Sequence, residues 1–133
     1  MKALIVEDDL TNRTLLKDFL AQYGDCQVAL NGKEAVKAFR SALEAKSPFN
    51  LICMDVVMPE MDGHQAVRVI RSLERSHRVR PSAQVKIIMT TALTDRGNVI
   101  ISAREQCDAY MVKPIDTGRL LNYLQSFGVL KSP

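Results

Sequence analysis

Five short apolar runs alternate along the chain with segments in which apolar residues recur every three or four positions. The runs lie at 3–6, 26–30, 51–54, 85–90 and 109–112. Runs this short and this apolar are typical of strands that are buried on both faces. The segments between them carry one apolar face at helical spacing, which predicts helices that bury one side. These faces contain Leu15, Leu16, Phe19, Leu20 and Tyr23; Ala35, Val36, Phe39 and Leu43; Ala66, Val67, Ile70 and Leu73; Val99, Ile100 and Ala103; and Leu120, Leu121, Leu124 and Phe127.

This alternation predicts an α/β fold in which strands and helices follow one another five times. Parallel strands joined by right-handed crossover helices give a doubly wound sheet that is covered on both sides. The pattern alone leaves two strand orders open, the flavodoxin-like order 2-1-3-4-5 and a half-Rossmann order. The fourth helix, at about 95 to 106, has the weakest apolar face. We expect a single domain over residues 1–128, followed by a short tail at 129–133.

Composition and charge exclude several classes of protein. Hydrophobic residues make up 47% of the chain and charged residues 25%, as in ordinary globular domains. No apolar stretch approaches the ~20 residues of a membrane helix, and no signal peptide precedes the first strand, so we expect a cytoplasmic protein that does not bind membranes. The net charge of +3 is too small and too scattered to indicate direct nucleic-acid binding. The arginines between 68 and 80 are interpreted as a solvated helix face and loop, and His64 and His77 as exposed.

Polar residues gather where the predicted strands end. Asp55 closes the third apolar run, and Pro59 and the turn at 62–63 break the strand after it. The first strand ends in the acids of 7–9, the fourth in 90–92 and the fifth in 113–114. In a parallel sheet the carboxyl ends of the strands meet at one edge, which is where ligands bind in open α/β folds.

The chemistry of these residues favours a metal ion and a phosphoryl group. Several carboxylates facing one another repel strongly, and a divalent cation relieves that repulsion. Few carboxylate ligands, completed by water and phosphate, suit Mg²⁺. A lysine and a hydroxyl beside them can hold a phosphoryl group. No glycine-rich phosphate loop follows the first strand, which argues against a nucleotide site of the usual kind.

Four motifs surround the ends of these strands. They are Leu4-Ile5-Val6-Glu7-Asp8-Asp9, Met54-Asp55-Val56-Val57-Met58-Pro59-Glu60-Met61-Asp62-Gly63, Ile88-Met89-Thr90-Thr91-Ala92 and Tyr110-Met111-Val112-Lys113-Pro114. In this order they resemble the motifs of a bacterial two-component response regulator receiver domain, the CheY-like family. The resemblance covers nearly all of the chain and implies the flavodoxin-like strand order.

The resemblance implies a phosphoacceptor and a Mg²⁺ site. Asp55 matches the aspartate that accepts a phosphoryl group from a sensor histidine kinase or a histidine phosphotransfer protein. Asp9 matches the direct Mg²⁺ ligand, together with Asp55 and the backbone carbonyl of Val57, and Asp8 matches the acid that holds the ion through water. Asp8 and Asp9 also stand where a helix cap would, so one of them can cap the first helix as well.

The resemblance also implies a switch. Thr91 would donate its hydroxyl to the phosphoryl group, Lys113 would pair with it, and the ring of Tyr110 would turn inward as Thr91 moves. The peptide bond between Lys113 and Pro114 is expected to be cis. The output face would lie on the fourth helix, fifth strand and fifth helix, at about 95 to 127, and would bind a downstream protein or a second copy of the chain.

On this reading the protein is a phosphorylation-driven switch and not an enzyme with turnover. One alternative is a Mg²⁺-dependent phosphatase of the haloacid-dehalogenase type, which needs an acid where this chain has Val57. Another is a flavodoxin-like electron carrier, which needs a phosphate loop. Val57 and Leu93 are apolar where family members often carry polar side chains that orient the hydrolytic water, so we expect a long-lived phosphorylated state.

Overall fold

The fold is built on a five-stranded parallel sheet with the order β2-β1-β3-β4-β5. A computed structural model describes residues 1–92 and 107–131. The strands are β1 (Lys2–Val6), β2 (Asp25–Ala29), β3 (Leu51–Asp55), β4 (Lys86–Thr91) and β5 (Ala109–Val112). Each lies within a residue of an apolar run in the sequence. The predicted α/β architecture is confirmed, and the strand order is the flavodoxin-like one.

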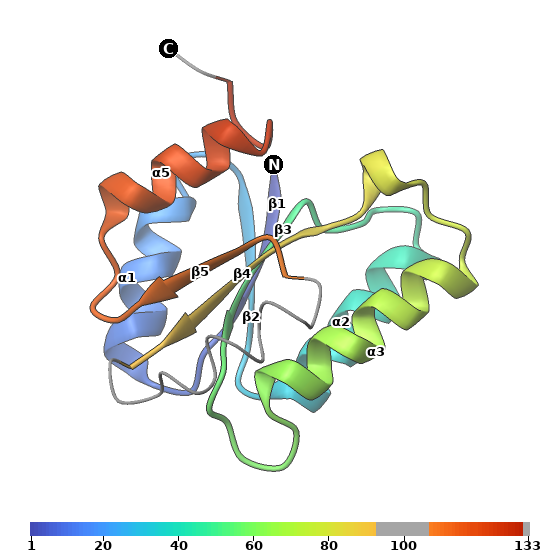
Figure 1. Cartoon of the computed structure of the whole chain (residues 1–133), viewed down its shortest axis with the longest axis horizontal. Helices are drawn as coiled ribbons and strands as arrows, with labels where there is room; N and C mark the ends of the chain where they lie inside the picture. Colours follow the sequence, from blue (N-terminus) through green and yellow to red (C-terminus); the bar gives the residue numbers. More distant parts are fainter. Residues whose placement is uncertain (93–106, 132–133) are drawn as a thin grey trace.

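Helices cover both faces of the sheet. Figure 1 shows α1 (Leu10–Leu20) and α5 (Thr117–Ser126) on one face, and α2 (Gly32–Glu44) and α3 (Gly63–Ser76) on the other. A short 3₁₀ helix, η1 (Pro81–Ala83), leads into β4. The helix expected at 95–106 lies outside the described residues. No helix in the described part of the chain is both long enough and apolar enough to cross a membrane.

Each of these four α-helices is directly preceded by an Asp or Asn whose side chain accepts a hydrogen bond from a backbone N–H of the first turn. Such caps satisfy donors that have no partner within the helix. At α3 the cap is a full capping box, because the Gln65 side chain also accepts from the backbone N–H of Asp62. The four caps are Asp9, Asn31, Asp62 and Asp116.

Alternation along the buried strands divides the core into two layers. One layer packs between the sheet and α2 and α3, and the other between the sheet and α1 and α5. The first contains Leu4, Val6, Ile52, Met54, Ile87 and Met89 from the strands, and the second Ala3, Ile5, Leu51, Cys53, Ile88 and Met111. Because both faces are covered, all five residues of β3 are buried, Asp55 included.

A buried ion network joins α3 to the start of β4 and β5. The Arg71 guanidinium donates to Glu74 at 2.7 Å, to the Val85 carbonyl at 2.9 Å and to Asp108 at 3.1 Å. The other Glu74 oxygen accepts from the Val85 N–H at 2.8 Å, and Asp108 accepts from the Ile87 N–H. Arg71 therefore departs from the solvated position expected for the arginines of this segment, since only 5% of it is exposed.

Candidate functional site

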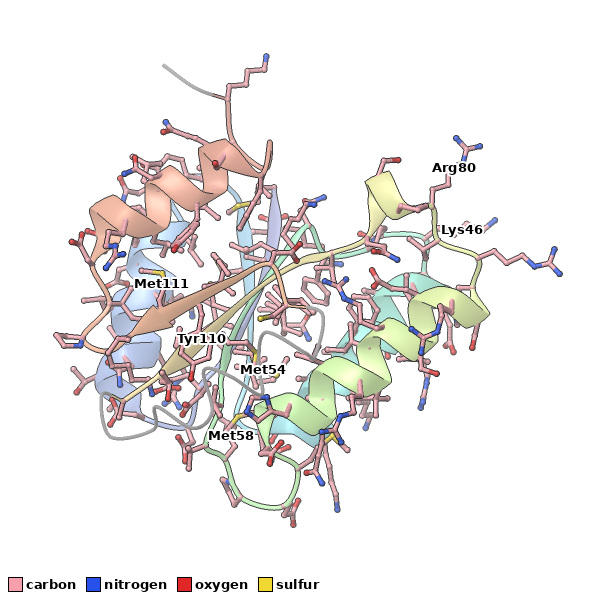
Figure 2. The ribbon with its side chains drawn as sticks, in the orientation of Figure 1. Lys46, Met54, Met58, Arg80, Tyr110 and Met111 are labelled. Carbon is pink, nitrogen blue, oxygen red and sulfur yellow. The ribbon has the colours of Figure 1, made fainter. Side chains whose placement is uncertain are left out.

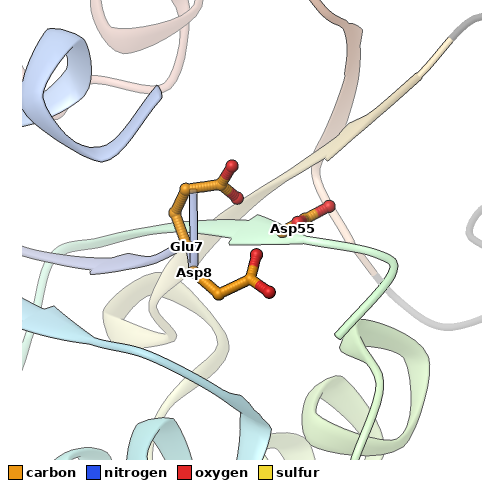
Figure 3. A group of neighbouring side chains, drawn as sticks. All are labelled: Glu7, Asp8 and Asp55. Atoms are coloured by element: carbon orange, nitrogen blue, oxygen red, sulfur yellow. The ribbon is translucent and has the colours of Figure 1, made fainter. Parts of the chain in front are cut away.

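Three carboxylates meet at the carboxyl edge of the sheet. Glu7 and Asp8 directly follow β1, and Asp55 is the last residue of the neighbouring β3. One carboxylate oxygen from each lies within 4.8 Å of the other two (Figure 3). Glu7 and Asp55 are buried and Asp8 is exposed, so the group opens to solvent on the Asp8 side.

Lys113 reaches this group from the end of β5. Its Nζ lies 2.9 Å from a Glu7 carboxylate oxygen and 3.3 Å from the Asp55 Oδ2. The peptide bond between Lys113 and Pro114 is cis, as the family resemblance implies. One ammonium group thus balances part of the negative charge of three acids.

The electrostatics of the group show an excess of negative charge. The pKa of Glu7 is raised to about 7, mainly by burial and also by the neighbouring Asp55, while Lys113 acts in the opposite direction. Burial alone would lower the pKa of Lys113, but its hydrogen bonds and attraction to Glu7 and Asp55 leave it raised. The second Glu7 oxygen is buried and accepts no hydrogen bond from residues 1–92 and 107–131. Oxygen ligands with uncompensated charge fit a small divalent cation.

The acidic group contains Glu7 and Asp8 beside Asp55, where Asp8 and Asp9 were expected from the sequence. The carboxylate of Asp9 accepts from the Asn12 N–H at 2.9 Å and caps α1, and Asp9 is not a member of the acidic group. Glu7, which sequence reasoning did not select, is a member. The signal is the pairing register: Val6 aligns with Met54 in the parallel sheet, so Glu7 comes next to Asp55.

The other predicted residues lie on β4, on β5 and directly after β3. Thr91 is the last residue of β4 and is buried, and Tyr110 is half-buried on β5 against the core on the α2 and α3 side. The backbone N–H of Val57 donates to Asp55 at 3.3 Å, while 57% of the Val57 residue is exposed. The roles of Thr91 and Tyr110 in a switch stay predictions. Figure 2 shows the place of Tyr110 along the strand.

The first turn of α3 is held against the end of β3. The N–H of Gly63 donates to the Val56 carbonyl at 2.9 Å. A Cβ atom at Gly63 would lie 2.6 Å from the backbone oxygen of Asp55, so no larger residue fits without a shift. The neighbouring His64 was expected to be exposed, and the structure shows that it is buried, with 5% of the residue exposed. His77 is exposed as expected.

Comparison with known proteins gives a single family. The family model described as "Response regulator receiver domain" matches residues 3–125. The chemotaxis protein CheY of Listeria monocytogenes is 34% identical over 128 residues, which cover 94% of this chain and 96% of that protein. A probable histidine kinase of Oryza sativa is 34% identical over 131 residues, which cover 91% of this chain but 12% of the kinase. The chain therefore spans only a small part of the kinases that it matches.

Solved structures of receiver domains are also similar to this chain. The receiver domain of a Pseudomonas aeruginosa sensor histidine kinase, with magnesium coordinated in the active-site cleft, is 28% identical with a TM-score of 0.76, and 95% of each chain is covered. A second is the receiver domain of a Saccharomyces cerevisiae response regulator, crystallised with a histidine phosphotransfer protein. It is 26% identical with a TM-score of 0.81, and the match covers 100% of this chain and 92% of that one.

Proposed function

The chain belongs to the response regulator receiver domain family, and from this membership we propose that Asp55 is its phosphoryl acceptor in a two-component or phosphorelay system. One observation carries the proposal: Asp55 shares an acidic group with Glu7 and Asp8 while its Oδ2 lies 3.3 Å from the Lys113 ammonium. This combination places a nucleophilic oxygen, a cation site and a fixed positive charge within one small volume. We propose residues 1–128 as the receiver unit.

Mg²⁺ is the cofactor that this acidic group fits. Asp8 and Asp55 would bind the ion with the backbone carbonyl of Val57, and the free Glu7 oxygen would contribute directly or through water. When bound, the ion neutralises charge that develops on the phosphoryl oxygens. We propose Asp8 for the ligand position expected for Asp9, because Asp8 and not Asp9 belongs to the acidic group, and Asp9 caps α1.

The proposed reaction moves one phosphoryl group. An Asp55 carboxylate oxygen attacks phosphorus, a P–O bond forms, and the P–N bond to a histidine of the donor breaks, with the histidine nitrogen as the leaving group. The Lys113 ammonium would pair with one phosphoryl oxygen, and the Thr91 hydroxyl would donate to another. These steps transfer a group once per chain and describe a signalling switch more than an enzyme that turns over a substrate.

The relatives indicate the donor. Receiver domains of histidine kinases and a receiver crystallised with a phosphotransfer protein resemble this chain, so the proposed donor is a sensor histidine kinase or a histidine phosphotransfer protein. We propose that β5 and α5 form part of the output face, which binds a downstream protein or a second copy. A phosphatase of the haloacid-dehalogenase type needs an acid two residues after the nucleophile, and Val57, two residues after Asp55, supplies none.

Phosphorylation with a small phosphodonor and Mg²⁺ tests the proposal. Intact-mass measurement should show one phosphoryl group on the wild type and none on Asp55→Asn. Mg²⁺ titration calorimetry should show at least about tenfold weaker binding for Asp8→Asn, since a direct ligand is lost. The matched variant Asp9→Asn keeps a good helix cap and should bind as the wild type does. Loss of binding in Asp9→Asn alone would return the ligand role to Asp9.

A further inference from the structure

Helices α2 and α3 are both followed, directly after the C-cap residue, by a basic residue in a left-handed backbone conformation. Lys46 has a φ of 57° and Arg78 a φ of 54°. At α2 the N–H groups of Lys46 and Ser47 donate to the carbonyls of Leu43 and Ala42. At α3 the N–H groups of Arg78 and Val79 donate to those of Arg75 and Glu74 in the same pattern. Glycine is the usual residue at this position of a helix end, because a Cβ atom strains the left-handed conformation.

The chain itself provides the comparison. Helix α5 ends in the same motif, in which Gly128 and Val129 donate to Gln125 and Leu124, and here the left-handed residue is glycine, with a φ of 74°. Two of three equivalent positions thus carry a strained basic residue. A cation near a helix C-terminus gains from the helix dipole. This favourable interaction with the helix dipole explains one positive charge at each helix end, but it does not explain Arg75 and Arg80 beside Arg78.

Four basic residues gather where α2 and α3 end, and we call Lys46, Arg75, Arg78 and Arg80 the basic cap. All four are exposed, and none takes part in an ion pair within residues 1–92 and 107–131. The carboxylate nearest in sequence to Arg75 is that of Glu74, which is buried and bound to Arg71. Figure 2 shows Lys46 and Arg80 projecting at the end of the molecule remote from Met58, which follows Asp55 in the chain.

We propose that the basic cap is a docking site for an acidic segment of a partner protein. Its hydrogen-bonded helix ends hold Lys46 and Arg78 on a fixed backbone, which lowers the entropy lost on binding. Arginine side chains present paired N–H donors that match the two oxygens of a carboxylate. This inference goes beyond the proposed phosphorylation of Asp55, since the cap lies on the helix ends and loops at the opposite edge of the sheet.

The surroundings of the cap favour a protein over other anions. Binding to single-stranded nucleic acid relies on aromatic side chains for stacking, and the loop from Ser76 to Gln84 has no Phe, Tyr or Trp. Stable binding to a bilayer needs an apolar anchor beside the charges. The exposed large hydrophobic side chains of the described residues are Leu10, Leu15, Leu30, Val57 and Val112, none of which is in the cap segments.

Fluorescence anisotropy with a labelled polyglutamate peptide tests this proposal. The cap variant combines Lys46→Gly, Arg75→Gln, Arg78→Gly and Arg80→Gln. The control variant, Lys17→Gln, Lys33→Gln, Lys37→Gln and Arg119→Gln, removes the same charge from other exposed positions. We expect the cap variant to raise Kd by at least about tenfold, and the control variant to change it by less than about threefold. Added salt should weaken wild-type binding.

Folding and partner class are checked in the same series. Glycine relieves the left-handed strain at positions 46 and 78, so the thermal midpoint of the cap variant should not fall below that of the wild type. Asp55→Asn should bind the peptide as the wild type does, which separates this proposal from the phosphorylation proposal. The proposal is overturned by absent wild-type binding or by equal losses in the two variants. Tighter binding of a DNA duplex or of anionic phospholipid vesicles than of the peptide also overturns it.

Discussion

Replacing Arg71 with methionine should destabilise the protein far more than replacing any neighbouring arginine. Only 5% of Arg71 is exposed, and it donates to Glu74, Asp108 and the Val85 carbonyl. Methionine fills much of the volume but leaves the Glu74 carboxylate buried beside the Val85 N–H alone. Removing one partner of a buried ion pair costs about 3–5 kcal/mol. That loss is a large share of the about 5–15 kcal/mol by which a domain is usually stable.

Urea unfolding followed by circular dichroism measures this loss. The matched control is Arg75→Met, one turn further along α3 and exposed, which should cost less than about 0.5 kcal/mol. The double variant Arg71→Met, Glu74→Leu removes both charges, so its cost should be smaller than the sum of the single variants by at least about 2 kcal/mol. A cost below about 1 kcal/mol for Arg71→Met, or additive single variants, would refute the role given to the network.

Three further predictions concern the site itself. Gly63→Ala should cost about 1–3 kcal/mol in urea unfolding, because its Cβ would press on the backbone oxygen of Asp55; a neutral result would show that α3 can shift away. Val57→Asn should shorten the lifetime of the phosphorylated state, measured as phosphate release; an unchanged lifetime would contradict the role of an apolar side chain there. The pKa of Glu7 is raised to about 7 in the folded state, so between about pH 4.5 and 7 the folded state binds more protons than the unfolded state. The contribution of Glu7 to the free energy of unfolding therefore falls as the pH rises through that range. In Mg²⁺-free buffer Glu7→Gln should remove that decline, and a parallel pH profile would exclude Glu7 as its source.

The sequence predicts the strands well because each is a short apolar run that both layers of helices bury. It also predicts that Asp55 and Lys113 lie at the same edge of the sheet, because each directly ends or follows such a run. Which of the three adjacent acids at 7–9 lie beside Asp55 is harder to predict from the sequence, since the three do not differ in polarity. The pairing of Val6 with Met54 decides it, and that register is a property of the folded sheet.

Buried polar residues on helices are the other class that sequence reasoning misses. Arg71 and His64 lie on α3, where polar and apolar residues alternate. Helical periodicity predicts that polar positions on such a helix face the solvent. The burial of Arg71 depends on partners that are distant in the chain, such as Asp108. A charged residue on the edge of an apolar helix face is therefore a position where tertiary contacts outweigh the local pattern.

These contacts also bear on how a switch can work in this molecule. Helix α3 is fixed at its first turn, where the N–H of Gly63 bonds to Val56 after β3. At its other end Glu74 binds the backbone of Val85 before β4, and Arg71 binds Asp108 before β5. The two strands that carry Thr91 and Lys113 at their carboxyl ends are thus tied at their starts to the same helix. Any movement of Thr91 and Lys113 toward a phosphoryl group on Asp55 is then expected at the carboxyl ends of the strands, without sliding of whole strands against α3.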